Sequence, residues 1–164
     1  TNAFAKAEIF DEGLFSYMAK VALEVPVRES DSQNVAVIIN AYAKADMLEG
    51  EPATAALMDK LALDIPRLSP DLTNAQAIGN IVNGYARYIQ ALHRPLRLTK
   101  TDRAVYCSMA RLALGLNASD FDVQSLTLLA HAFARIYVPD KGDDDEDARE
   151  KEEEEALYSA LFTH

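Results

Sequence analysis

Gln33–Lys44, QNVAVIINAYAK, decides the fold because similar stretches recur along the chain. Gln76–Arg87 reads QAIGNIVNGYAR and Gln124–Arg135 reads QSLTLLAHAFAR, beginning 43 and 91 residues later. Its last five residues also match Asn2–Lys6, NAFAK. Self-similarity at a spacing of roughly 20–50 residues is typical of repeat architectures. The sequence therefore predicts a repeat protein.

Each copy carries the apolar spacing of an amphipathic helix. In the first copy, apolar residues recur at i, i+3, i+4 and i+7, which places them on one helix face. The side chains predicted to face inward are Val35, Ile38, Ile39 and Tyr42, then Ile78, Ile81, Val82 and Tyr85, then Leu126, Leu129, Ala130 and Phe133.

Prolines, glycines and polar residues divide the chain into two alternating kinds of helix. We use "A-type" for helices that contain the recurring stretch and "B-type" for the partner helix that follows each. The predicted A-type helices are Thr1–Ala7, Asp31–Met47, Leu72–Leu92 and a helix from Ser119 or Asp120 to Tyr137. The predicted B-type helices are Leu14–Val25, Ala53–Ile65, Thr101–Leu116 and Ala148–Phe162. The expected N-caps are Ser30 or Ser32 for the second A-type helix, and Ser119 or Asp120 for the fourth.

This alternation predicts an all-α fold, a right-handed α-solenoid of about three and a half antiparallel helix-pair repeats. Residues 1–164 are expected to form a single array, as part of a longer protein. No repeat should be stable alone, because each buries its apolar stripe against its neighbours.

Charge is unevenly distributed along the chain. The net charge is −10, but Asp140–Glu155 alone holds eleven acidic and three basic residues, and the rest is close to neutral. A block of like charges is usually solvated. We therefore interpret residues 139–152 as an acidic, flexible insert between the A-type and B-type helices of the fourth repeat.

The sequence contains no motif for a reaction. The single cysteine, Cys107, excludes an internal disulfide. No apolar run approaches the length of a membrane span, and there is no phosphate-binding glycine loop. The acidic segment lacks the spacing of a calcium-binding loop. We therefore expect no enzyme activity, no cofactor, no metal and no membrane insertion.

A second stripe, distinct from the apolar one, repeats along the A-type helices. Steps of four, three and four residues place its members on one helix face. We call this set the polar ladder: Gln33, Asn40, Lys44, Gln76, Asn80, Asn83, Arg87, Gln124, His131 and Arg135. Two interpretations are open. The amides tie neighbouring A-type helices together while the basic residues complement the helix dipole, or the stripes form a binding surface for RNA or a peptide.

The connection before the third B-type helix is basic. Its residues Arg94, Arg97, Lys100 and Arg103 form what we call the basic edge. Because equivalent loops of a solenoid project from the same edge, we expect the acidic insert to lie next to the basic edge and to compete with polyanions there.

The copies NAFAK, NAYAK, NGYAR and HAFAR, with partner helices such as LMDKLALDIP, resemble the heptatricopeptide repeats of organellar proteins. Such repeats often precede a RAP domain, and their relatives include FAST kinase-like proteins. The resemblance covers nearly the whole chain, although the intervals here are longer than the family's and no RAP segment is present. It implies a role in mitochondrial or plastid RNA metabolism, including rRNA processing and ribosome assembly.

These observations lead to two functional hypotheses. The first is a non-catalytic mitochondrial scaffold that binds single-stranded RNA, rRNA or a ribonucleoprotein through the polar ladder, with no DNA expected as a partner. The alternative is a protein–protein interaction scaffold, or a structural subunit of a large mitochondrial complex.

Overall fold

The computed structural model describes residues 11–25, 31–45, 51–92 and 98–136, together with Ala156 and Ser159. All regular secondary structure in these residues is helical, which confirms the all-α prediction for them. The helices are α2 (Glu12–Glu24), α3 (Ser32–Lys44), α4 (Pro52–Asp64), α5 (Ala75–Ala91), α6 (Lys100–Leu114) and α7 (Val123–Ile136), with short 3₁₀ turns η2 (Ile65–Arg67), η3 (Pro70–Leu72) and η4 (Ala118–Asp120). No helix in this part of the chain is long and apolar enough to cross a membrane.

The first and last predicted helices fall largely outside the described residues. Thr1–Ala7 lies wholly outside them, and of Ala148–Phe162 only Ala156 and Ser159 are described, both helical. The acidic insert, residues 139–152, also lies outside them.

The N-terminus of α3 is capped by a residue other than those predicted. The Asp31 side chain accepts a hydrogen bond from the Asn34 N–H at 2.6 Å, as an N-cap does. Ser32 lies inside the helix, and its hydroxyl donates to the Leu72 carbonyl at 2.7 Å. The prediction of Ser32 as the cap was wrong because its hydroxyl joins α3 to the turn before α5. Ser30 lies outside the described residues.

Helix α7 begins later than predicted, and its cap is also a different residue. Asp122 accepts a hydrogen bond from the Ser125 N–H at 2.6 Å, directly before the helix. The hydroxyl and the N–H of Ser125 both donate hydrogen bonds to the Asp122 carboxylate. These two hydrogen bonds lower the pKa of Asp122 below its usual value. The predicted caps were wrong because Ser119 and Asp120 belong to η4, where the Asp120 side chain accepts from the Asn117 N–H at 3.0 Å.

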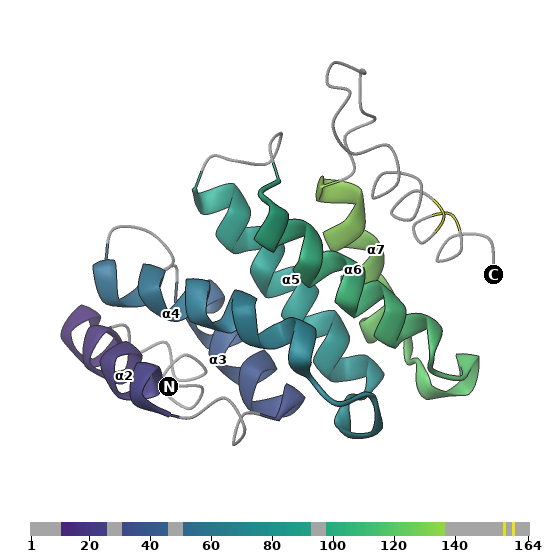
Figure 1. The fold of residues 1–164 in the computed structure, drawn as a ribbon, viewed down its shortest axis with the longest axis horizontal. Helices are drawn as coiled ribbons and strands as arrows, with labels where there is room; N and C mark the ends of the chain where they lie inside the picture. The colour runs from purple at the N-terminus through teal and green to yellow at the C-terminus, as the bar shows by residue number, and fades with distance from the viewer. Residues whose placement is uncertain are drawn as a thin grey trace, which may run out of the picture.

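The six helices form two layers (Figure 1). The A-type helices α3, α5 and α7 pack side by side, and α2, α4 and α6 form the second layer against them. The A-type helices run in the same direction. Ser32 at the start of α3 reaches Leu72 just before α5, and Ile39 later in α3 lies at Gly84 later in α5.

Buried aromatic residues at equivalent positions of the repeats join the two layers. Tyr42 of α3 lies edge-on to Phe15 of α2, with ring centroids 5.3 Å apart, and its hydroxyl donates to the Phe15 carbonyl at 2.7 Å. Tyr106 of α6 lies between Tyr85 of α5 and Phe133 of α7, at centroid distances of 6.0 and 5.6 Å. All five side chains are buried, which confirms Tyr42, Tyr85 and Phe133 as core residues.

The inward-facing predictions hold for α3 and α5 but fail in part for α7. In α3 only Ile38 is less than fully buried, and in α7 Leu129 and Phe133 are buried. Leu126 is 52% exposed and Ala130 is exposed, so their prediction as inward-facing was wrong. The equivalent residues of α3 and α5 lie on the side where the next A-type helix packs, and no described helix covers that side of α7 (Figure 1).

The absence of a side chain at Gly84 allows α5 to approach α3 closely. A Cβ at this position would overlap Cγ2 of Ile39, a buried β-branched side chain with little rotamer freedom in a helix. We expect Gly84→Ala to destabilise the protein by about 1–3 kcal/mol, despite the better helix propensity of alanine. Urea denaturation followed by circular dichroism measures the change.

Gly115 is the matched control for Gly84. It ends α6 with helical backbone angles, and an added Cβ there would meet only ordinary contacts. Gly115→Ala should be neutral or stabilise by up to about 1 kcal/mol, because alanine restricts the unfolded chain. Ile39→Leu, which removes the Cγ2 methyl group, should recover part of the Gly84→Ala loss. Equal stability of the two alanine variants would contradict the close contact between α3 and α5.

Candidate functional site

The polar ladder comes from three parallel, neighbouring helices. Its stripes lie on α3, α5 and α7, each beginning in the first turn or two with a glutamine and ending in the last turns with a basic residue. Helices packed in this way lie about 8–10 Å apart. Equivalent residues of the three stripes therefore repeat at that spacing across the A-type layer.

Most of the ladder side chains are accessible to solvent. Its exposed members are Gln33, Lys44, Gln76, Arg87, Gln124, His131 and Arg135. Its half-buried members are Asn40, Asn80 and Asn83. Between the polar side chains lie Val37, which is 37% exposed, and the half-buried Leu128. The surface is therefore polar at its ends, with small apolar areas in between.

The amides of the ladder do not tie the A-type helices together in the described part of the chain. Side-chain hydrogen bonds there involve caps, tyrosine hydroxyls, a few serine and threonine hydroxyls and the Lys60–Asp64 ion pair, for example Ser32 to Leu72 and Tyr85 to Asp102. No glutamine or asparagine of the ladder takes part in one with another described residue. Their donors and acceptors are thus available to a ligand.

The basic ends of the stripes differ in their surroundings. Lys44 and Arg135 lie in the last turns of α3 and α7, where a positive charge is favourable for the helix dipole. Arg135 also acts on Tyr106. Burial raises the pKa of the Tyr106 hydroxyl well above its usual value, and a smaller increase comes from Asp102, while the charge of Arg135 acts in the opposite direction.

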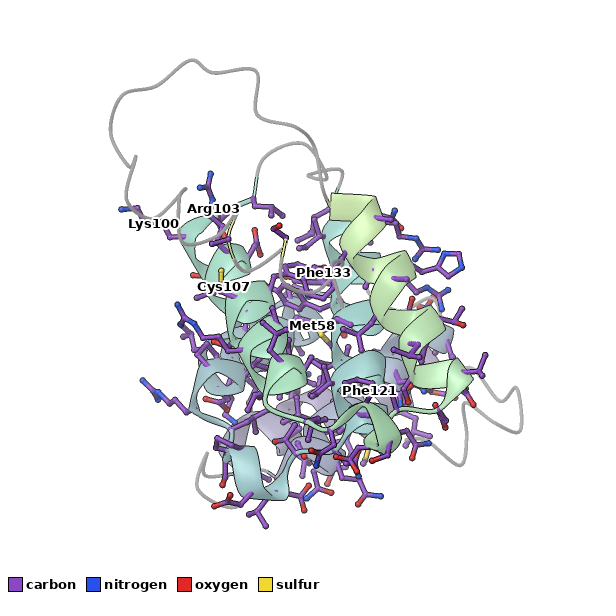
Figure 2. The ribbon with its side chains drawn as sticks, turned by 90° about the vertical axis from the view of Figure 1, so that its right-hand side faces the viewer. Met58, Lys100, Arg103, Cys107, Phe121 and Phe133 are labelled. Carbon is purple, nitrogen blue, oxygen red and sulfur yellow. The ribbon has the colours of Figure 1, made fainter. Side chains whose placement is uncertain are left out.

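The described half of the basic edge lies at one end of α6. Lys100 is exposed and Arg103 is half-buried, and both are at the start of α6 (Figure 2). Arg94 and Arg97 lie outside the described residues, as does the acidic insert expected beside them. Cys107, one turn further along α6, is partly exposed. The described residues contain no cluster of three or more histidine, cysteine, aspartate or glutamate side chains that could hold a metal ion.

Sequence reasoning missed a buried polar network between α5 and α6. Asp102 is 2% exposed; its Oδ1 accepts from the Tyr85 hydroxyl at 2.7 Å. Its Oδ2 accepts from the N–H and the hydroxyl of Thr99, at 2.8 and 2.7 Å. The Asp102 N–H donates back to the Thr99 hydroxyl, which completes a capping box. The threonine–x–x–aspartate spacing was the signal that could have revealed the cap.

A buried hydroxyl group without a hydrogen-bond partner lies beside this network. Among the described residues, the buried Tyr106 hydroxyl has no hydrogen-bond partner, although its ring packs between Tyr85 and Phe133. Figure 2 shows Phe133 pointing from α7 into this interior. The arrangement serves packing between α5, α6 and α7.

No family model, curated protein or solved structure matches this chain at a significant level.

Proposed function

We propose that this chain is a non-catalytic α-solenoid, with helix-pair repeats of the heptatricopeptide kind, that binds single-stranded RNA along the polar ladder. On this proposal it serves mitochondrial RNA metabolism, with rRNA or a ribonucleoprotein as the natural ligand. The two-layer packing of alternating helices and the recurring QNVAVIINAYAK pattern support the repeat architecture. The longer interval between the second and third described copies is accommodated by longer helices, since α5 and α6 have 17 and 15 residues where α3 and α4 have 13 each.

One observation carries the proposal for RNA. Three parallel helices each present an exposed glutamine, an asparagine or histidine, and an exposed basic residue in the same order. Amides hydrogen-bond base edges or ribose hydroxyls, and lysine or arginine neutralises phosphates. A repeated unit of that kind suits a repeated ligand, in which each nucleotide carries the same set of groups.

Salt dependence provides the test. We expect the triple variant Lys44→Gln, Arg87→Gln, Arg135→Gln to reduce the slope of log affinity against log salt for single-stranded RNA. The expected loss is about 0.7 units for each lost phosphate contact, or about 2 in all. Filter binding or fluorescence anisotropy at several salt concentrations measures the slope.

A control variant with the same change in net charge distinguishes phosphate binding by the ladder from a general effect of charge on RNA binding. Lys20, Arg67 and Arg111 are exposed basic residues outside the ladder, on α2, η2 and α6. Replacing these three with glutamine should leave the slope almost unchanged. An unchanged slope in the ladder variant, or equal losses in both variants, would contradict binding of phosphates by the ladder.

The alternative function, a protein–protein scaffold, is favoured by the apolar Val37 and Leu128, which lie between the ladder residues, and by the low net charge outside the acidic segment. A partner helix would use such contacts. This alternative predicts no salt-dependent RNA binding at all. It also predicts that Val37→Asp disrupts association with a partner, while the basic triple variant does not.

A further inference from the structure

The side of each A-type helix that faces the next one can be compared across α3, α5 and α7. We call this side the trailing face. The equivalent residues in α3, α5 and α7 are Ser32, Ala75 and Val123; Val35, Ile78 and Leu126; Ala36, Gly79 and Thr127; Ile39, Val82 and Ala130; and Ala43, Ala86 and Ala134.

In α3 and α5, all ten trailing-face residues are buried. The following helix makes the contact at two of these positions. Gly84 of α5 lies directly against Ile39 of α3. A Cβ on Gly79 of α5 would meet the Ser125 carbonyl oxygen of α7 at 3.2 Å and the Leu128 Cβ at 3.4 Å. The same interface is thus formed twice.

In α7, all five equivalent residues are exposed. Val123 is 82% exposed and Leu126 is 52% exposed, where their counterparts in α3 and α5 are at most 2% exposed. The five side chains contain no charged group. Four of them are apolar, and the hydroxyl of the fifth, Thr127, donates to the Val123 carbonyl at 2.7 Å. Together they form a largely apolar stripe at helical spacing on α7.

We propose that the trailing face of α7 is a docking site for one further A-type helix, lying parallel to α7 as α5 lies on α3. The argument is continuity with an interface that this chain already makes twice in the same register. Leucine and valine side chains left in water at these positions are unfavourable, and burying them provides the driving force. This inference does not depend on RNA binding.

The interface also defines the chemistry of the docking helix. At its closest approach to α3, α5 presents Gly84, and α7 carries Ala132 at the equivalent repeat position; both residues are buried. The docking helix should therefore carry glycine or alanine at this position, followed by a tyrosine or phenylalanine as in Tyr85 and Phe133. The small residue admits close approach, and the aromatic residue joins the second layer.

Residues 74–92, which include α5, provide a peptide probe with this pattern. We expect the fluorescently labelled peptide to bind the full chain saturably in an anisotropy titration. Leu126→Asp in the chain should weaken binding at least about tenfold, because it places a charge within an apolar contact. Leu126 is half exposed, so the variant should remain folded, and circular dichroism checks this.

Two further variants make the test specific. Leu63→Asp replaces a leucine of similar exposure on α4 and should leave binding unchanged. Ala130→Ile restores at α7 the residue that α3 places against Gly84, so it should tighten binding of the peptide. A peptide with Gly84→Leu should lose this gain, because the larger side chain cannot approach the isoleucine.

Several outcomes would overturn the proposal. One is the absence of saturable binding by the peptide. Another is an equal loss of binding in Leu63→Asp and Leu126→Asp. A third is self-association of the chain that Leu126→Asp abolishes and that the peptide does not inhibit, since the occupant of the face would then be a second copy of the chain.

Discussion

Replacing Tyr42 with alanine is expected to lower the free energy of unfolding by about 3–5 kcal/mol, the usual cost of truncating a buried aromatic residue. Tyr42 is 1% exposed, and its ring lies edge-on to Phe15. The ring is a main contact between α2 and α3, so a cavity there weakens the joint between the two layers. Urea denaturation followed by circular dichroism measures the loss.

Tyr42→Phe separates the ring from the hydroxyl. It keeps the edge-on contact but removes the hydrogen bond to the Phe15 carbonyl, so we expect a loss of only about 0.5–1.5 kcal/mol. Burial raises the pKa of the Tyr42 hydroxyl to about 12, so the hydroxyl stays protonated and able to donate even in mildly alkaline solution. A loss below about 1 kcal/mol in Tyr42→Ala would mean that the ring is not part of the core.

Replacing Asp102 with alanine is expected to cost about 2–4 kcal/mol, because it removes a helix cap and leaves a buried hydroxyl unpaired. The Asp102 carboxyl group accepts three hydrogen bonds, one from Tyr85 and two from Thr99. Without it, the start of α6 loses its capping box and the Tyr85 hydroxyl has no acceptor. The change is measured by urea denaturation, as for Tyr42.

Asp102→Asn and Tyr85→Phe resolve the two parts of this cost. The asparagine can still accept from the Thr99 N–H and contact the Tyr85 hydroxyl, so its loss should be smaller than that of alanine. Tyr85→Phe removes only the bond between α5 and α6. If the bond is real, the double variant Tyr85→Phe, Asp102→Ala will cost less than the sum of the single losses. Strict additivity would show that the two residues do not interact.

The helices and most of the core were predictable from the sequence. The apolar spacing of 3.6 residues depends on the geometry of the helix alone, so Ile39, Ile81 and Tyr85 could be placed on a buried face without knowing their neighbours. The same holds for the accessible ladder residues such as Gln76 and Arg87, which occupy another face of the same helix. Their function remains a proposal, because exposure does not identify a ligand.

The ends of the helices were less predictable. Ser32 and Asp120 both have side chains that cap helices well, yet each makes a different bond in the structure. Several polar residues near a helix start could act as its cap. Which of them does so depends on the hydrogen-bond acceptors that the rest of the fold brings close to the others. The Leu72 carbonyl, 40 residues from Ser32, was such an acceptor.

The sequence by itself determined that this chain forms alternating helices, and which residues of each helix are apolar, because both follow from local periodicity. Only the tertiary structure decided which apolar faces are covered. Val35, Ile78 and Leu126 hold the same repeat position, but the first two are buried by neighbours and Leu126 remains 52% exposed. Burial depends on the presence of a packing partner, and a pattern that is the same in every copy does not show which copies have one.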